Sequence, residues 1–121
     1  MIGFLRGKVF STGTHSLLLD VNGVGYEVFM TAPALMSLRA GEETFVYTHY
    51  HQKEDLVAIF GFLNMKTKEI FELLTGVSGL GPKTTLGVLS NIGEEDLISA
   101  IREGDVSSLV RVPGIGNKTA A

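Results

Sequence analysis

The first half of the chain, up to about residue 62, alternates apolar and polar residues in short runs rich in β-branched and aromatic side chains. Runs of this period, separated by turn residues, are typical of β-strands that bury one face. Asn22 and Gly23 predict a two-residue hairpin turn, because both residue types tolerate positive φ. The pattern predicts five strands, over Ile2–Phe10, Ser16–Val21, Val24–Met30, Thr44–Tyr50 and Leu56–Phe62.

One short helix is predicted between the third and fourth strands, over Ala34–Arg39, with Gly41 ending it. Five strands with a helix after the third fit a small OB-type barrel. An SH3-like barrel or a simple meander fits the same alternation. The pattern by itself does not choose among these three folds.

The second half has a different period, with apolar residues three and four positions apart from Lys66 onward, as in α-helices. Glu94, Glu95 and Asp96 lie in the first turn of the predicted helix that continues through Leu97 and Ile101, where carboxylates stabilise the positive end of the helix dipole. The change of period predicts two domains, a barrel at 1–63 and an all-α domain at 64–121. The recurring apolar residues are Ile70, Phe71, Leu73, Leu74, Leu86, Val88, Leu89, Leu97, Ile98 and Ile101.

The helical half contains an internal repeat at an offset of 35 residues (114 − 79). Residues 77–84, VSGLGPKT, align with residues 112–119, VPGIGNKT. Each copy lies between two predicted helices, so each reads as helix, short Gly-apolar-Gly turn, helix. Two copies indicate one doubled supersecondary unit.

The repeated turn predicts a phosphate-binding site. Its glycines permit a sharp bend, its apolar residue anchors the turn, and the first amides of the next helix attract an anion. The lysine of each copy is expected to contact DNA backbone rather than bases. A single Gly-x-Gly is more often only a turn or helix cap, and the repetition is what favours binding. The predicted phosphate-binding residues are Gly79, Leu80, Gly81, Lys83 and Thr84 in the first copy and Gly114, Ile115, Gly116, Lys118 and Thr119 in the second.

Composition removes several classes of function. The 121 residues contain no cysteine, which excludes disulfides, thiolate zinc sites and iron–sulfur clusters. Neither Gly-rich turn has Walker spacing, so ATP hydrolysis is not expected. No catalytic residue, metal ion or cofactor is predicted, since His15, His49 and His51 do not have convincing metal-ligand spacing. No apolar run approaches the roughly 18 residues of a membrane span, which favours a cytoplasmic protein.

The formal net charge of −3 argues mildly against a nucleic-acid partner. It is a sum over all surfaces, however, and one basic face is enough for DNA. Tyr26, Tyr47 and Tyr50 offer rings for base stacking, although strand aromatics are more often core or interface residues.

The sequence resembles the RuvA family along nearly its whole length, through residues 1–7, 23–28, 48–62 and 112–120. The resemblance implies an OB-fold followed by tandem helix-hairpin-helix motifs. It also implies a non-catalytic homotetramer, or an octamer of two tetramers, that holds open a four-way (Holliday) DNA junction in recombination and repair. The implied partners are the ATPase motor RuvB, which drives branch migration, and the resolvase RuvC. A third, C-terminal domain of the family is absent, so the chain is interpreted as a fragment that has lost its coupling to the motor.

The same resemblance assigns Glu54 and Asp55 to an acidic pin at the centre of the DNA-binding face. Carboxylates repel phosphates within a Debye length of about 8–10 Å, so a central acidic cluster would push strands apart. Taken alone, the pair reads as an ordinary solvated turn. A generic duplex-DNA-binding module that tethers an enzyme is the alternative function.

Overall fold

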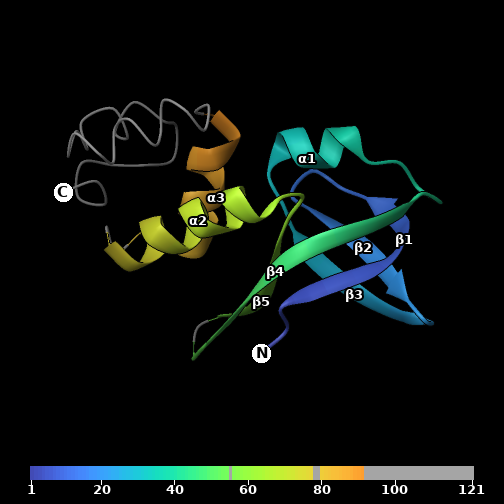
Figure 1. Cartoon of the computed structure of the whole chain (residues 1–121), viewed down its shortest axis with the longest axis horizontal. Helices are drawn as coiled ribbons and strands as arrows, with labels where there is room; N and C mark the ends of the chain where they lie inside the picture. Colours follow the sequence, from blue (N-terminus) through green and yellow to red (C-terminus); the bar gives the residue numbers. More distant parts are fainter. Residues whose placement is uncertain (55, 78–79, 92–121) are drawn as a thin grey trace. The chain divides into compact units, whose positions relative to one another are not determined.

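The computed structural model describes residues 1–54, 56–77 and 80–91. The element order is β1 (Phe4–Thr12), β2 (Ser16–Val21), β3 (Val24–Phe29), α1 (Ala32–Ser37), β4 (Glu43–Lys53), β5 (Leu56–Phe62), α2 (Met65–Val77) and α3 (Pro82–Asn91), drawn in Figure 1. None of the helices in these ranges is long and apolar enough to cross a membrane.

The five strands form a closed barrel in the order β1-β2-β3-β5-β4, with β4 returning to β1. All neighbours are antiparallel except β3 and β5, which run parallel. A five-stranded mixed barrel with its helix after the third strand is the OB-type arrangement, so the predicted fold class is confirmed.

The barrel core is built by alternation along each strand. Every second residue of β1 and β2 points inward, because successive side chains of a strand face opposite ways. Met30 and Leu35 close the core beside α1. The core residues are Leu5, Val9, Leu17, Leu19, Val28, Met30, Leu35 and Val46.

The hairpin between β2 and β3 turns at Asn22 and Gly23, as predicted. Both residues have positive φ, 51° and 87°, and the Asp20 carboxylate accepts a hydrogen bond from the Gly23 amide at 2.8 Å. Positive φ at both central residues gives the turn a twist that matches the flanking strands. The whole β2–β3 register, from Ser16↔Phe29 to Val21↔Val24, follows from this turn.

Helix α1 starts and ends two residues earlier than the predicted Ala34–Arg39. The Thr31 hydroxyl caps its first turn by accepting a hydrogen bond from the Ala34 amide at 3.3 Å. Pro33 fits that first turn because its missing N–H needs no partner there. Leu38 is extended, so the helix ends before the turn at Gly41, which has a φ of 90°.

The chain divides into two compact units, Met1–Lys68 and Glu69–Ala121. In the second unit the buried apolar side chains of the described residues are Ile70, Phe71, Leu74, Leu80, Leu86 and Val88. They recur at helical spacing, whereas Leu73 is 44% exposed.

Replacing Gly7 with Ala is expected to lower the free energy of unfolding by about 1–3 kcal/mol. A Cβ at Gly7 would overlap the backbone carbonyl oxygen of Asp20 on the neighbouring strand β2, which cannot move without disturbing the ladder. Urea denaturation followed by circular dichroism measures the loss. Gly25→Ala is the control, since a Cβ there meets no atom within 4 Å. Equal stabilities for the two variants would contradict the expected overlap.

Candidate nucleic-acid interface

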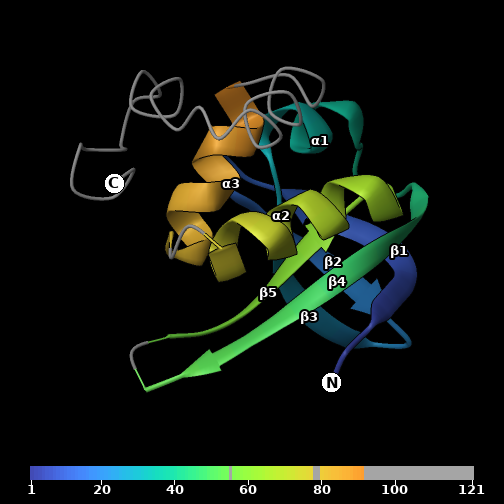
Figure 2. The same ribbon diagram turned by 60° about the vertical axis from the view of Figure 1, so that its left-hand side comes forward.

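The first candidate element is the hairpin of β4 and β5. Its last ladder pair is Lys53↔Leu56, and Glu54 lies in a turn directly after β4. All seven residues of β5 pair with β4, whereas the register with β3 includes only Ile59 and Phe60. Figure 2 shows this hairpin of β4 and β5 extending beyond the rest of the barrel.

The end of the hairpin is solvated and carries charge. Gln52, Lys53 and Glu54 are exposed. The other predicted member of the acidic pair, Asp55, lies outside the described residues. A carboxylate at the end of a projecting hairpin can come closer to a ligand than the surface of the barrel does. Its negative charge repels phosphate groups. The adjacent Lys53 ammonium offsets part of that charge.

The second candidate element is the start of α3. The carbonyl of Gly81 accepts hydrogen bonds from both the amide and the hydroxyl of Thr85, each at 2.9 Å. Leu80 is 3% exposed, which suits the anchoring role predicted for the apolar residue of the turn. Buried Leu80 and buried Thr85 therefore fix Gly81 from both sides.

The first turn of α3 offers groups that suit an anion. Gly81 and Lys83 are exposed, and Thr84 is half-buried. The amides at a helix start have no acceptor within the helix, and the helix dipole is positive there. A Cβ built at Gly81 meets no atom within 4 Å, so the space in front of this residue is open. This arrangement can hold a phosphate through backbone amides and a lysine ammonium.

The remaining predicted phosphate-binding residues lie outside the described part of the chain. They are Gly79 in the first copy and Gly114, Ile115, Gly116, Lys118 and Thr119 in the second.

The role of Thr85 was not predicted from the sequence. Its side chain is fully buried, and its hydroxyl returns to the Gly81 carbonyl. Thr84 and Thr85 are adjacent and identical, and only the phase of the helix decides which one is buried.

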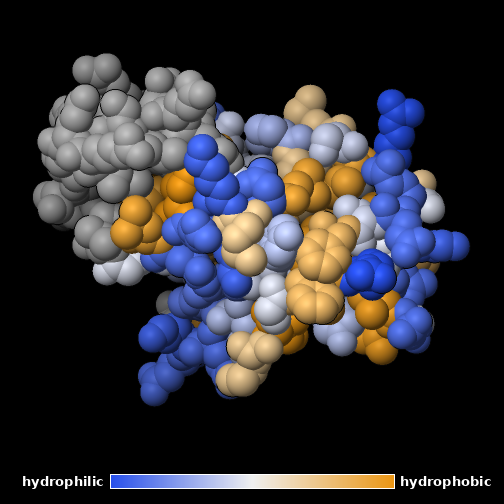
Figure 3. Space-filling model, in the orientation of Figure 1, coloured by the Kyte–Doolittle hydropathy of each residue, from blue (hydrophilic) through white to orange (hydrophobic). Residues whose placement is uncertain are grey.

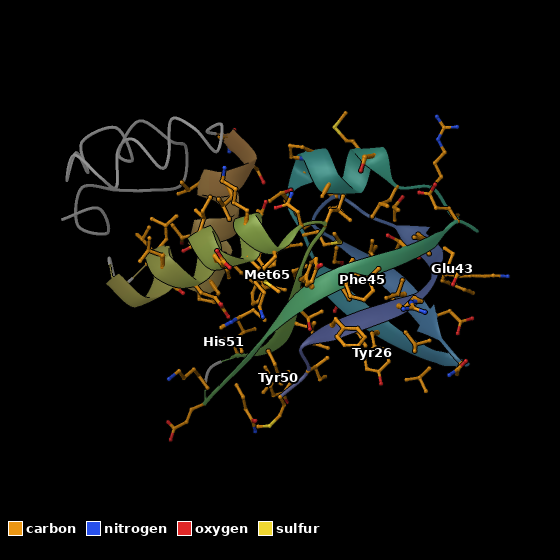
Figure 4. The ribbon with its side chains drawn as sticks, viewed as in Figure 1. Tyr26, Glu43, Phe45, Tyr50, His51 and Met65 are labelled. Atoms are coloured by element: carbon orange, nitrogen blue, oxygen red, sulfur yellow. The ribbon has the colours of Figure 1, made fainter. Side chains whose placement is uncertain are left out.

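Two tyrosines and one histidine of the barrel have side-chain contacts within it. Tyr26 packs against the core, and Tyr47 meets Phe45 edge-on with ring centroids 5.0 Å apart. Tyr50 and His51 lie on β4, where Figure 4 labels them, and the His51 ring contacts Phe60 edge-on. Among the described residues no group of three or more His, Asp or Glu side chains is placed to hold a metal ion.

Comparison with known proteins adds two family matches. A model described as the RuvA N terminal domain matches residues 1–61, and one described as a SAM-like helix-hairpin-helix tandem matches residues 71–121. Together they cover the barrel and most of the helical half.

Several curated proteins named Holliday junction branch migration complex subunit RuvA are similar to this chain. One from Bifidobacterium animalis subsp. lactis is 41% identical over 120 residues, covering 99% of this chain and 58% of that protein. One from Acinetobacter baumannii is 42% identical over 120 residues, covering 99% of this chain and 60% of that protein. The chain therefore spans about three-fifths of the length of these relatives.

Proposed function

The chain belongs to the RuvA family, and from that membership we propose that it binds four-way DNA junctions and catalyses no reaction. The proposal rests on the similarity over 120 residues to proteins named as subunits of a Holliday junction branch migration complex. The projecting hairpin with Glu54 and the open first turn of α3 are the parts of this chain that fit such a ligand.

The proposed mechanism divides the work between the two elements. The first turn of α3 holds a phosphate of a DNA arm through its amides and through Lys83. The second copy, at residues 114–119, does the same for a neighbouring phosphate. Glu54 and Asp55 at the end of the β4–β5 hairpin repel the strands at the crossover, so that an open junction is favoured over continuous duplex.

The assembly and the partners belong to the proposal as well. We propose a homotetramer that brings four hairpins to the centre of one junction. Branch migration would be driven by the ATPase RuvB, and RuvC would be able to cut the held junction. The domain bounds 1–63 and 64–121 remain a prediction.

A competition gel tests the proposed function. Labelled four-way junction is bound to the chain and challenged with unlabelled junction or with duplex of the same sequence. Junction should compete far better than duplex. Equal competition would instead support the generic duplex-binding module, and cleavage in the presence of magnesium would contradict a non-catalytic role.

Lys83→Ala is expected to weaken junction binding and to flatten its salt dependence by about one phosphate contact per subunit. Lys83 is exposed in the first turn of α3, where its ion pair with a phosphate would release one counterion from the DNA. Binding constants measured over a series of salt concentrations give the slope. Arg39→Ala, which removes another exposed cation from the barrel unit, is the control. An unchanged slope in Lys83→Ala would show that this lysine contacts no phosphate.

A further inference from the structure

We propose that the outer surface of β1 and β4 binds unpaired DNA bases, at a site separate from the hairpin end and from α3. Phe4, Arg6, Phe45 and Tyr47 make up this aromatic face. Leu5 and Val46 point into the barrel core, so their neighbours on β1 and β4 point outward. The register places Phe4 opposite Tyr47 and Arg6 opposite Phe45, which brings the four side chains together.

The rings of the aromatic face are in contact with one another. Phe4 stacks on Phe45 with centroids 5.0 Å apart and planes 22° apart, and Tyr47 meets Phe45 edge-on at 5.0 Å. The Arg6 guanidinium lies 6.0 Å from the centroid of Phe45. Figure 3 shows an apolar patch on the surface at β1 and β4, bordered by hydrophilic side chains, and Figure 4 labels Phe45 there.

The face remains accessible despite its apolar character. Phe4 is 58% exposed, and Phe45 and Tyr47 are only half-buried. Single exposed apolar residues are common and need no explanation, but three rings grouped beside an arginine form a surface suited to a ligand. A flat base can stack on Phe4 without any rearrangement of the barrel.

The charges favour a nucleic acid over a second copy of this chain. Arg6 and Lys8 are both exposed on β1. Lys8 lies between two carboxylates in the register, Glu43 on β4 and Asp20 on β2. The cation available beside the rings is therefore Arg6, which lies near Phe45. Aromatic rings beside cations are the combination that single-stranded DNA binding uses, with the rings stacking bases and the cations meeting phosphates. A two-fold contact between copies would instead bring the Arg6 side chains of the two faces toward each other.

The aromatic face shares strand β4 with the hairpin end. Tyr47 precedes Glu54 by seven residues (54 − 47), which is roughly 24 Å at 3.4 Å per residue. The inference rests on the proposed function only for its context, because bases that exchange partners during branch migration are transiently unpaired. Binding of unpaired bases can be measured without a junction.

The test measures fluorescence anisotropy of labelled oligothymidylate at low salt, with the four-way junction titrated in parallel. Phe4→Ala and Phe4→Leu should each weaken oligothymidylate binding by about fivefold or more, and Phe4→Tyr should restore it. Leucine keeps most of the apolar volume but has no aromatic ring, so weaker oligothymidylate binding by Phe4→Leu would identify ring stacking as the interaction that is lost. Phe10→Ala is the matched control, since Phe10 is 69% exposed on the same strand and should have no effect.

Two results would overturn the inference. The first is wild-type chain that binds the junction but not oligothymidylate, which leaves the proposed function intact. The second is a set of Phe4 variants with unchanged oligothymidylate affinity and a smaller assembly in sedimentation velocity, which would assign the face to contacts between copies. If oligothymidylate binding depends on Phe4 while junction and duplex compete equally, the inference stands and the proposed function fails.

Discussion

Changing Glu54 to Gln and Asp55 to Asn is expected to raise the affinity for plain duplex DNA about tenfold at low salt, and to reduce the preference for junctions. The substitutions remove two negative charges per chain and keep side-chain size. Each charge about 10 Å from a phosphate contributes roughly 0.4 kcal/mol of repulsion in water, and several phosphates lie within reach of a projecting hairpin. The phosphate contacts at α3 are unchanged in this variant. The substitutions therefore remove repulsion between protein and DNA without removing any attraction.

The dependence on salt concentration distinguishes loss of electrostatic repulsion from a change in the conformation of the hairpin. Screening shortens the range of repulsion, so the gain in duplex affinity should shrink as ionic strength rises. Duplex and junction affinities are measured for wild type and double variant at two salt concentrations. Glu27→Gln is the control, because it removes an exposed carboxylate on β3, away from the hairpin end and from the outer face of β1 and β4. An unchanged duplex-to-junction ratio at low salt would show that Glu54 and Asp55 are only a solvated turn.

Strand limits are predicted correctly from this sequence where turn residues bound a short run of apolar residues. Strands β2 and β5 have the predicted limits, Ser16–Val21 and Leu56–Phe62. Asn22 and Gly23 have the predicted positive φ. Strand β2 buries Leu17 and Leu19 on one face, whereas β5 is apolar along its whole length and is indicated by its short length and its β-branched and aromatic residues.

The sequence was less informative where burial does not impose a pattern. Strand β4 continues to Lys53, beyond the predicted end at Tyr50, because the outer part of the hairpin is held by its pairing with β5. Helix α1 has six residues, too few for its apolar positions to fix the start. The Thr31 cap and Pro33 were the signals that would have located it.

Some residues of the candidate interface can also be recognised in the sequence, and others can be recognised only in the structure. The Gly-apolar-Gly turn and its lysine are visible because they occur twice, and the acidic pair because of its place in a family pattern. Nothing in the sequence marks Phe4 and Phe45 as partners, because they are 41 residues apart (45 − 4) and meet only through the β1–β4 pairing that closes the barrel. Which outer faces of a barrel stay uncovered is decided by tertiary structure.

Gly81→Val is expected to lower the affinity for both junction and duplex by about tenfold or more while the chain keeps its fold. The residue precedes α3 and faces open space, since a Cβ there meets no atom within 4 Å. Among the described glycines Gly23 and Gly41 have positive φ and Gly81 does not, so a side chain at this position causes no backbone strain. Valine is a poorer residue than glycine just before a helix, and stability should fall by only about 1 kcal/mol.

The loss of affinity has a different origin from that small loss of stability. A branched side chain at Gly81 occupies the space through which a phosphate reaches the first amides of α3, and each charge-assisted hydrogen bond lost there costs about 1.5–3 kcal/mol. Junction and duplex affinities are measured beside a urea denaturation curve for the same variant. Gly25→Val is the control, because it adds the same side chain at an exposed glycine of β3 that also has no atom within 4 Å. A folded Gly81→Val chain with wild-type affinity would mean that the first turn of α3 does not hold a phosphate, and that other residues of the chain bind the DNA.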